Sequence, residues 1–220
     1  MTTLVKIQEI KALIKHRMNG EVAENMRLAG IVYKVNYGVS IPELREIAQQ
    51  YVGDHDLALE LFKEDIRECK IIASLIDDPA KVTGEQIDSW SEDFDNPEIV
   101  EQACSNLIWK SKYALSRSIE WCISGNELLR KAGMLIIGRN ASDESLNDKI
   151  FEPYVDIFGN MADEVTDVYQ SAMLYALRGI AKRNDGLRQK VVELCNSMSE
   201  SENELAAWIA NELLYEFVES

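Results

Sequence analysis

The 220-residue sequence predicts an all-α fold, an α-solenoid in which short helices stack in pairs. Three observations favour it. Apolar residues recur near a period of 3.6 along almost the whole chain, and no segment alternates as a strand would. Turn-forming residues divide the chain into helical pairs of roughly 30–40 residues, the unit length of HEAT and armadillo repeats. Prolines and glycines are few, 4 and 11 respectively.

Apolar periodicity defines two helices at the beginning of the chain, near residues 4–14 and 22–31. The third helix has a complete start signal: Ser40 as the cap, Glu43 three residues later as the other half of a capping box, and Pro42 in the first turn. Periodicity and turn signals then predict further helices at 41–51, 55–63, 66–77, 84–93, 97–109, 113–123, 127–139, 145–158, 164–183, 187–198 and 202–218.

The breaks between these helices contain residues that favour turns. They are Gly53-Asp54, Asp77-Asp78-Pro79, Asp95-Asn96-Pro97, Ser124-Gly125-Asn126, Gly159-Asn160 and Asn184-Asp185-Gly186. The repeat interpretation depends on spacing, because literal repetition of sequence is weak. We therefore predict one HEAT-like repeat domain over residues 1–220, with a compact helical bundle as the alternative. In a solenoid, one helix of each pair lines a concave groove, and helices 97–109, 127–139 and 164–183 are the candidates.

The charge is strongly acidic, with a net value of −15 and a pI of about 4.6. Such a total argues against nucleic acid, because phosphate contacts need Lys and Arg. The distribution weakens that objection. Residues 109–139 contain six basic residues against two acids, and residues 175–190 contain five against one. These segments form either a local basic surface on an acidic body or ordinary solvated helix faces.

Several classes of function lack their sequence signals. No apolar run approaches the roughly 20 residues of a membrane span, and the first residues do not resemble a secretory signal. The four cysteines are far apart and only two histidines are present, so we expect buried free thiols, no metal and no cofactor. A reducing, cytoplasmic location is the expectation that follows. The sequence contains no phosphate-binding glycine loop and no nucleophile elbow.

Several segments resemble, in order and spacing, the HEAT-repeat DNA alkylation repair glycosylases. Tyr37-Gly-Val-Ser-Ile-Pro-Glu-Leu-Arg45 and Asp65-Ile-Arg-Glu-Cys-Lys-Ile-Ile-Ala73 are similar to the characteristic middle segment of that family. The resemblance also includes Asn19 to Met26, Asp93 to Gln102, Arg130 to Gly133, and Ala172 to Arg178. The resemblance covers most of the chain. It implies a HEAT-like fold and a divergent member of that family.

The resemblance implies hydrolysis of the N-glycosidic bond of 3- or 7-alkylated purines in DNA. Such a base is cationic and a good leaving group, so a carboxylate that stabilises the oxocarbenium-like sugar, together with aromatic faces, suffices without a metal. The family's carboxylate position falls on Glu101, where the pattern has Asp. The aromatic position before it falls on Pro97, the second aromatic on Tyr175, and the groove arginine on Lys131. All four positions are therefore changed.

These residues also have structural interpretations. A glutamate near the start of a helix complements the helix dipole, so Glu101 need not be catalytic, and Pro97 fits the first position of a helix. Tyr175 is either a core residue or a groove residue. The second interpretation gains from Arg178 and Lys182, which follow it at i+3 and i+7 on one helix face.

A nearby alternative site combines Trp90 with Asp93 and Asp95, which could replace the changed residues if the alignment shifts by one turn. Asp95 precedes Asn96-Pro97 directly, so it also fits the capping turn of the next helix.

The resulting hypothesis is a DNA glycosylase acting on alkylated double-stranded DNA. Glu101 acts as the carboxylate, Tyr175, Lys131 and Trp90 contact the damaged nucleotide, and Arg178, Lys182, Arg139 and Lys110 bind the DNA backbone. A non-catalytic protein that binds DNA structures and a protein-interaction scaffold are the alternatives. The segment from Ser199 onwards has six acids and no base, so we expect it to avoid phosphate and to leave an acidic face open for a protein partner.

Overall fold

The computed structural model describes residues 2–219, which form thirteen α-helices joined by short turns and 3-10 segments. Within these residues the only β pairing is an isolated parallel bridge between Val35 and Ile66. The all-α prediction is therefore confirmed. The chain divides into two compact units, residues 1–113 and 114–220, and each is described by itself. The prediction of one repeat domain stays a prediction.

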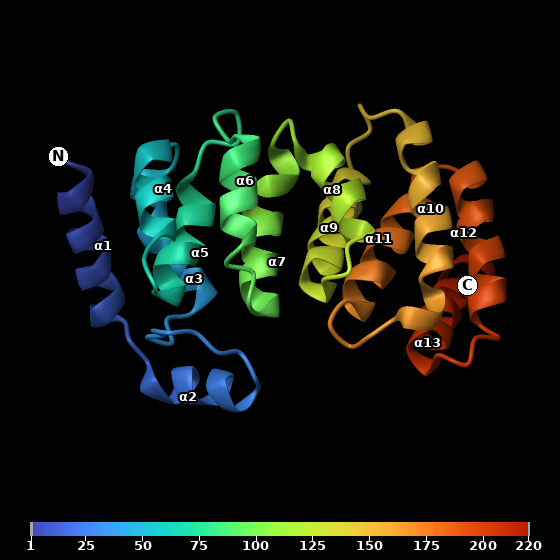
Figure 1. Ribbon diagram of the computed structural model, residues 1–220, viewed down its shortest axis with the longest axis horizontal. Helices are drawn as coiled ribbons and strands as arrows, with labels where there is room; N and C mark the ends of the chain where they lie inside the picture. Colours follow the sequence, from blue (N-terminus) through green and yellow to red (C-terminus); the bar gives the residue numbers. More distant parts are fainter. Residues whose placement is uncertain (1, 220) are drawn as a thin grey trace. The chain divides into compact units, whose positions relative to one another are not determined.

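The first unit is built around one central helix (Figure 1). Its helices are α1 (Thr3–His16), α2 (Gly20–Leu28), α3 (Ile41–Ala48), α4 (His55–Phe62), α5 (Arg67–Ile76), α6 (Gly84–Ser91) and α7 (Pro97–Asn106). Helix α5 packs against α1, α3, α4 and α7. Nine of its ten residues are buried as a result, including charged ones. Polar groups in this helix must therefore find partners inside the unit.

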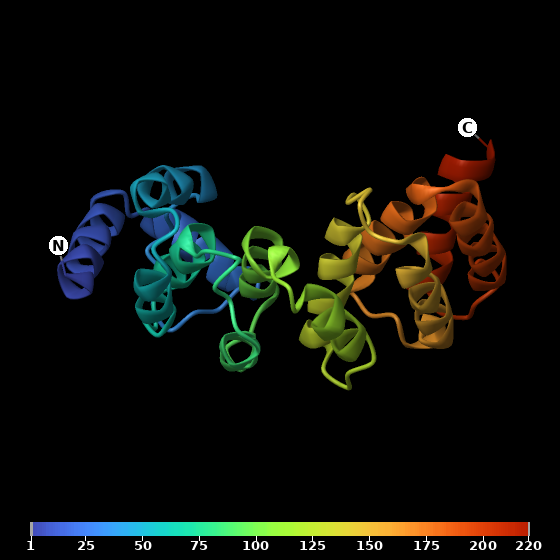
Figure 2. The ribbon, with the colours of Figure 1, turned by 90° about the horizontal axis from the view of Figure 1, so that it is seen from above.

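The second unit stacks its helices in two layers (Figures 1 and 2). They are α8 (Ala114–Cys122), α9 (Glu127–Asn140), α10 (Glu152–Asn160), α11 (Gln170–Arg183), α12 (Asp185–Met198) and α13 (Glu204–Leu214), followed by a π-helical turn, η5 (Tyr215–Glu219). Helix α11 packs against α9 and α13 in its own layer and against α12 in the other. Phe151, Tyr154, Phe158 and Tyr169 fill the core of this unit.

Local start signals predicted the helix boundaries well. Ser40 Oγ accepts from the Glu43 amide and Glu43 Oε2 accepts from the Ser40 amide, so the capping box is confirmed. Two predicted starts were too early. The helix expected from residue 145 begins at Glu152, with Pro153 in its first turn, and the one expected from 164 begins at Gln170. The predicted break at Gly159-Asn160 lies in the last turn of α10.

Within the described residues, no helix is long and apolar enough to cross a membrane. All four cysteines are buried free thiols, as predicted. Burial raises the pKa of Cys122 and of Cys195 to about 12, so neither is a thiolate at neutral pH.

Candidate nucleic-acid interface

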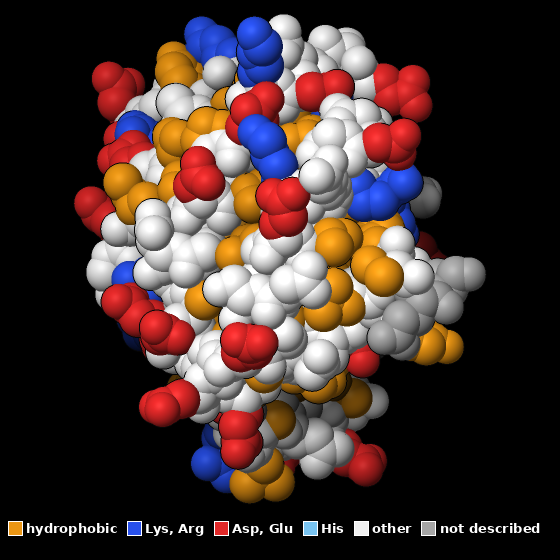
Figure 3. Space-filling view, turned by 90° about the vertical axis from the view of Figure 1, so that its right-hand side faces the viewer, with side chains coloured by type: hydrophobic (Ala, Val, Ile, Leu, Met, Phe, Trp, Pro, Cys, Tyr) orange, Lys and Arg blue, Asp and Glu red, His pale blue; other side chains and the backbone are white. Residues whose placement is uncertain are grey.

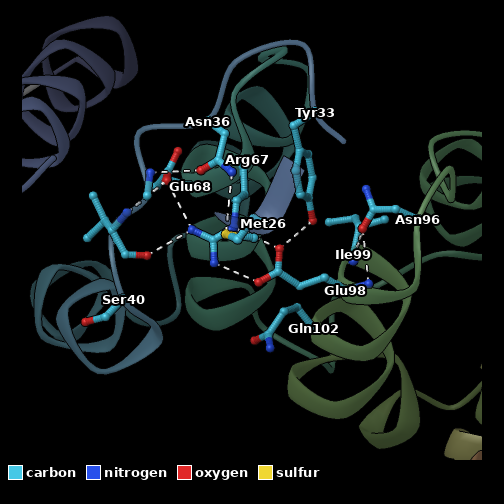
Figure 4. Close-up of polar contacts among 12 residues, drawn as sticks. Met26, Tyr33, Asn36, Ser40, Arg67, Glu68, Asn96, Glu98, Ile99 and Gln102 are labelled. Carbon is cyan, nitrogen blue, oxygen red and sulfur yellow. Dashed lines mark hydrogen bonds and ion pairs between the residues drawn. The ribbon is translucent and has the colours of Figure 1, made fainter. Parts of the chain in front are cut away.

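The two motif segments of the first unit meet at a buried carboxylate (Figure 4). Glu68 in α5 is fully buried and accepts hydrogen bonds from the backbone amides of Tyr37 and Val39, all at 3.2 Å. Arg67 donates to the Val39 carbonyl at 2.9 Å and to Glu68 at 3.1 Å. The motif residues thus hold the loop before α3 against α5.

Arg67 also fixes the position of α7. Its Nε and Nη2 donate to the two carboxylate oxygens of Glu98 at 2.8 and 2.7 Å, a bidentate pair. Tyr33 donates to the same carboxylate at 2.9 Å (Figure 4). Burial opposes the charge on Arg67, but its hydrogen bonds to Glu98 and Glu68, together with the negative charges of both carboxylates, more than compensate and raise the arginine pKa. Burial and the Glu98 charge raise the pKa of Tyr33, which therefore stays a neutral donor.

The first-turn acid of α7 is Glu98, and Glu101 lies one turn further along. Glu101 is half-buried. Pro97 occupies the first turn, and Asn96 caps the helix by accepting from the amides of Glu98 and Ile99 at 3.1 and 3.2 Å. The structural interpretation of Pro97 is confirmed. Because Arg67 of α5 donates two hydrogen bonds to Glu98, it fixes α7, the helix that contains Glu101, against α5.

The residues of the alternative site have partners in the first unit. The Trp90 ring is 4% exposed and stacks on Phe62 with centroids 3.8 Å apart. Asp93 pairs with Lys70 at 2.6 Å, and Asp95 accepts from the Asn96 side chain at 2.8 Å. Trp90 therefore packs in the core, and Asp95 belongs to the capping turn. Sequence periodicity missed the burial of Trp90 because the stacking partner comes from α4.

Tyr175 lies at the surface of the second unit, with 37% of the residue exposed. Its ring covers Gly138 of α9, where an added Cβ would be 2.5 Å from the ring. Gly138 thus makes room for the ring between α9 and α11. Tyr175 is therefore only partly buried: one part of its ring packs on Gly138 and another part contacts solvent.

Arg178 and Lys182 follow Tyr175 on α11, and both contact one carboxylate. Glu216 of η5 accepts from Arg178 Nε at 2.6 Å through Oε2 and from Lys182 Nζ at 2.7 Å through Oε1. The two cations do share a helix face, as the i+3 and i+7 spacing predicted. Local spacing does not point to Glu216, because this residue lies 38 positions after Arg178, in the acidic segment that we expected to avoid phosphate.

The other predicted DNA-contacting cations differ in exposure. Lys131 in α9 is 5% exposed. Arg139, in the last turn of the same helix, is exposed, and so is Lys110 of the first unit, whose ammonium lies 5.6 Å from the Trp109 ring centroid. Neighbouring Lys112 is also exposed and lies 5.0 Å from the Tyr113 ring centroid. An open phosphate contact suits Arg139, Lys110 and Lys112 better than Lys131.

Most cations of the two basic segments are neutralised within their own unit. At least seven of the eleven form ion pairs with carboxylates: Arg117, Arg130, Arg178, Lys182, Arg183, Arg188 and Lys190. Lys110, Lys112 and Arg139 make no ion pair with any described carboxylate. The face at the α12–α13 side of the second unit carries many carboxylates and few Lys or Arg side chains (Figure 3). The basic surface is therefore smaller than the sequence suggested.

Comparisons with known proteins agree on the fold. One solved structure, described as a new family of proteins related to the HEAT-like repeat DNA glycosylases with affinity for branched DNA structures, matches with a TM-score of 0.77. The two chains are 18% identical over 99% of this chain and 96% of that one. A search of curated proteins gives no match. The family described as DNA alkylation repair enzyme matches residues 8–214. A match over nearly the whole chain shows that this protein belongs to the DNA alkylation repair enzyme family.

Proposed function

We propose that this protein recognises the phosphate backbone and the shape of DNA, and that it prefers branched DNA to a plain duplex. The observation that carries the proposal is the surface of α11 and α9, where half-exposed Tyr175 lies over Gly138 and Arg178 follows on the same helix face. An aromatic ring beside cations suits contact with nucleotides. The described relative with affinity for branched DNA has the same fold.

The charge of the protein favours a branched ligand. With a net charge of −15, long-range repulsion opposes binding to any DNA. Few open cations remain, among them Lys110, Lys112 and Arg139. At a junction, phosphates of several strands crowd together, so each cation meets a stronger negative potential than on one duplex. The few open cations of each unit therefore gain more from a junction than from a duplex.

The test compares a four-way junction with a linear duplex of equal length and composition, over a range of salt concentrations. We expect tighter binding of the junction, with an affinity that falls as salt rises. Lys110→Ala with Arg139→Ala weakens binding and reduces the slope of log affinity against log salt by roughly 0.9 for each lost phosphate contact. Lys63→Ala, which removes an exposed cation already paired with Glu60, is the matched control.

Absence of binding to both DNAs at low salt would refute the proposal and leave the protein-interaction scaffold. Equal affinity for the junction and the duplex would keep DNA binding but remove the preference for branched DNA.

A second candidate function is excision of N3- or N7-alkylated purines. Glu101 favours it, because this half-buried carboxylate stands on a helix that the Arg67–Glu98 pair holds in place. A carboxylate can stabilise the oxocarbenium-like sugar and orient water, while an aromatic face such as that of Tyr175 attracts the cationic base. The long stem of Glu101 and the missing ring at Pro97 count against efficient catalysis.

Release of 7-methylguanine and 3-methyladenine from methylated duplex DNA tests this candidate. Release by the wild type that Glu101→Gln abolishes would support excision and identify the carboxylate. Bound DNA without release would exclude excision and leave the binding function. Glu120→Gln, at an exposed carboxylate of α8, controls for the loss of one negative charge.

A further inference from the structure

The carboxylate of Glu216 bridges two cations of α11. Its two oxygens accept from Arg178 and Lys182 separately, at 2.6 and 2.7 Å. The side chains are 33% exposed for Arg178, 58% for Lys182 and 30% for Glu216, so the cluster is open to solvent. Half-exposed Tyr175 lies one turn before Arg178 on the same helix. The cluster therefore occupies the surface that the proposed function offers to DNA.

An ordered turn presents Glu216 at this position. Helix α13 packs against α11, and η5 continues directly from α13. Phe217, next to Glu216, packs against the core of the second unit, and the Arg188 guanidinium lies 5.9 Å from its ring centroid. Tyr215 and Val218, by contrast, are 66% and 62% exposed. Phe217 thus anchors a turn from which Tyr215 and Val218 project into solvent.

The bridging carboxylate has the chemistry of a phosphate substitute. Like a phosphodiester, it offers two oxygens that share one negative charge to donors on two side chains. The hydrogen bond from Lys182 lowers the pKa of Glu216, against the opposing effect of desolvation, and Arg178 lowers it further. The carboxylate is therefore ionised at neutral pH and neutralises much of the charge of both cations.

We propose that Arg178 and Lys182 form a phosphodiester-binding site that Glu216 occupies in the DNA-free protein, so that DNA must displace this carboxylate to bind. The inference rests on the proposed function and adds that Glu216 competes with DNA phosphate for the two cations. The wild type binds DNA more weakly than it would if Arg178 and Lys182 were open, because both cations already pair with Glu216. Loss of the charge on Glu216 frees the site.

The experiment measures the affinity of the full chain for a four-way junction in three forms: wild type, Glu216→Gln and Glu212→Gln. Glu212 is exposed in α13, one turn before Glu216, so its substitution removes the same charge from the same segment without touching the cations. We expect Glu216→Gln to bind on the order of tenfold more tightly, since charge-assisted hydrogen bonds become available to phosphate. Glu212→Gln should change affinity much less.

A second pair of variants tests whether the effect passes through the two cations. In a background of Arg178→Ala and Lys182→Ala, Glu216→Gln should no longer strengthen binding. Equal gains for the two glutamine variants, or a gain that persists in the alanine background, would overturn the inference and indicate a general charge effect. Weaker binding by Glu216→Gln would also overturn it.

These outcomes separate the inference from the proposed function. A wild type that binds the junction while Glu216→Gln changes nothing refutes the competition by Glu216 and keeps DNA binding. Absence of binding by every form refutes both. Binding by Glu216→Gln alone supports both, with Glu216 as a complete block.

Discussion

Arg67 compensates two carboxylates at once, Glu68 beside it and Glu98 from α7. Its own side chain is 4% exposed and that of Glu68 is fully buried. A buried charge is tolerated only where it is paired and hydrogen-bonded. The residues that gave the motif its family resemblance therefore have a clear structural role, which is to join the loop before α3, helix α5 and helix α7.

Replacement of Arg67 by alanine should destabilise the protein severely. The variant leaves Glu68 as a buried charge without its cation, and breaking such a pair costs about 3–5 kcal/mol. The free energy of unfolding, measured with urea, checks this. Lys34→Ala is the control, because its pair with Asp65 is 75% and 58% exposed and should contribute little to the free energy of unfolding. Similar losses for both variants would contradict the expectation.

At the scale of the elements, the backbones of α8 and α9 approach each other closely at Gly133. A Cβ there would lie 2.6 Å from the Ser118 carbonyl oxygen and 2.8 Å from the Cys122 amide nitrogen. Both are backbone atoms of α8, so they cannot rotate away as a side chain could. Ser118 Oγ also donates to the Gly133 carbonyl at 3.0 Å. The packing of the two helices depends on the missing side chain.

Gly133→Ala should therefore lower the melting temperature, although alanine is the better helix former. The propensity gain of about 1 kcal/mol is smaller than the overpacking cost, which reaches about 3 kcal/mol. Gly125→Ala is the matched control, since a Cβ there would meet no atom within 4 Å. A rise in stability for Gly133→Ala would show that α8 moves away at little cost.

The loop between α9 and α10 is held by one side chain of α11. Arg183 donates to the carbonyls of Ala141, Asp143 and Leu146 at 2.7–3.0 Å and to the Asp148 carboxylate at 2.7 Å. The hydrogen bond from Arg183 lowers the pKa of Asp148 below 3.8, against a smaller effect of desolvation. The Arg183 side chain is only 6% exposed and is therefore closed to phosphate, unlike those of Arg178 and Lys182.

The lowered pKa sets the pH dependence of this pair. A carboxyl group whose pKa is lower in the folded state contributes fully to the stability of the fold at a pH above its unfolded-state pKa. This contribution is lost as the pH falls through the folded-state pKa. Asp148→Asn should therefore lower the melting temperature at pH 7, with a difference from the wild type that narrows below about pH 3.8. Melting curves between pH 3 and 7 check this. A difference constant over that range would show that charge plays no part.

On the scale of the whole molecule, the excess of carboxylates should slow the approach of DNA. Residues 199–220 contain six acids and no base, and Glu200, Glu202 and Glu204 are exposed. Their field reaches about 10 Å at 0.1 M salt and is screened at high salt. Substitution of these three residues by glutamine should raise the association rate with DNA at low salt, and the advantage should vanish near 1 M.

Stopped-flow association over a salt series measures this effect. An advantage independent of salt would indicate that the three glutamates contact DNA directly. Asn196→Ala and Ser197→Ala, at neutral exposed positions of α12, should leave the rate unchanged.

Local sequence signals were enough to predict the helices and most of their beginnings. Capping by Ser40 and by Asn96, the position of Pro97 and the 3.6 period are interactions between residues a few positions apart, so they are legible without the fold. The all-α class and the family resemblance followed from the same local patterns. The two late starts, at Glu152 and Gln170, occur where 3-10 segments precede the helix.

The environment of the candidate residues depends on tertiary contacts that the sequence does not reveal. Trp90 is buried because Phe62 of α4 stacks on it, and Arg178 meets Glu216, a residue 38 positions away. Whether a cation is open to phosphate depends on which carboxylate the fold brings near it, and that proximity is not encoded in local spacing. Tyr175 packs one side of its ring on α9 because Gly138 of that helix makes room for it, and 37% of the residue stays exposed. Long-range packing sets exposure and charge pairing, and these two properties decide which residues a DNA backbone can reach.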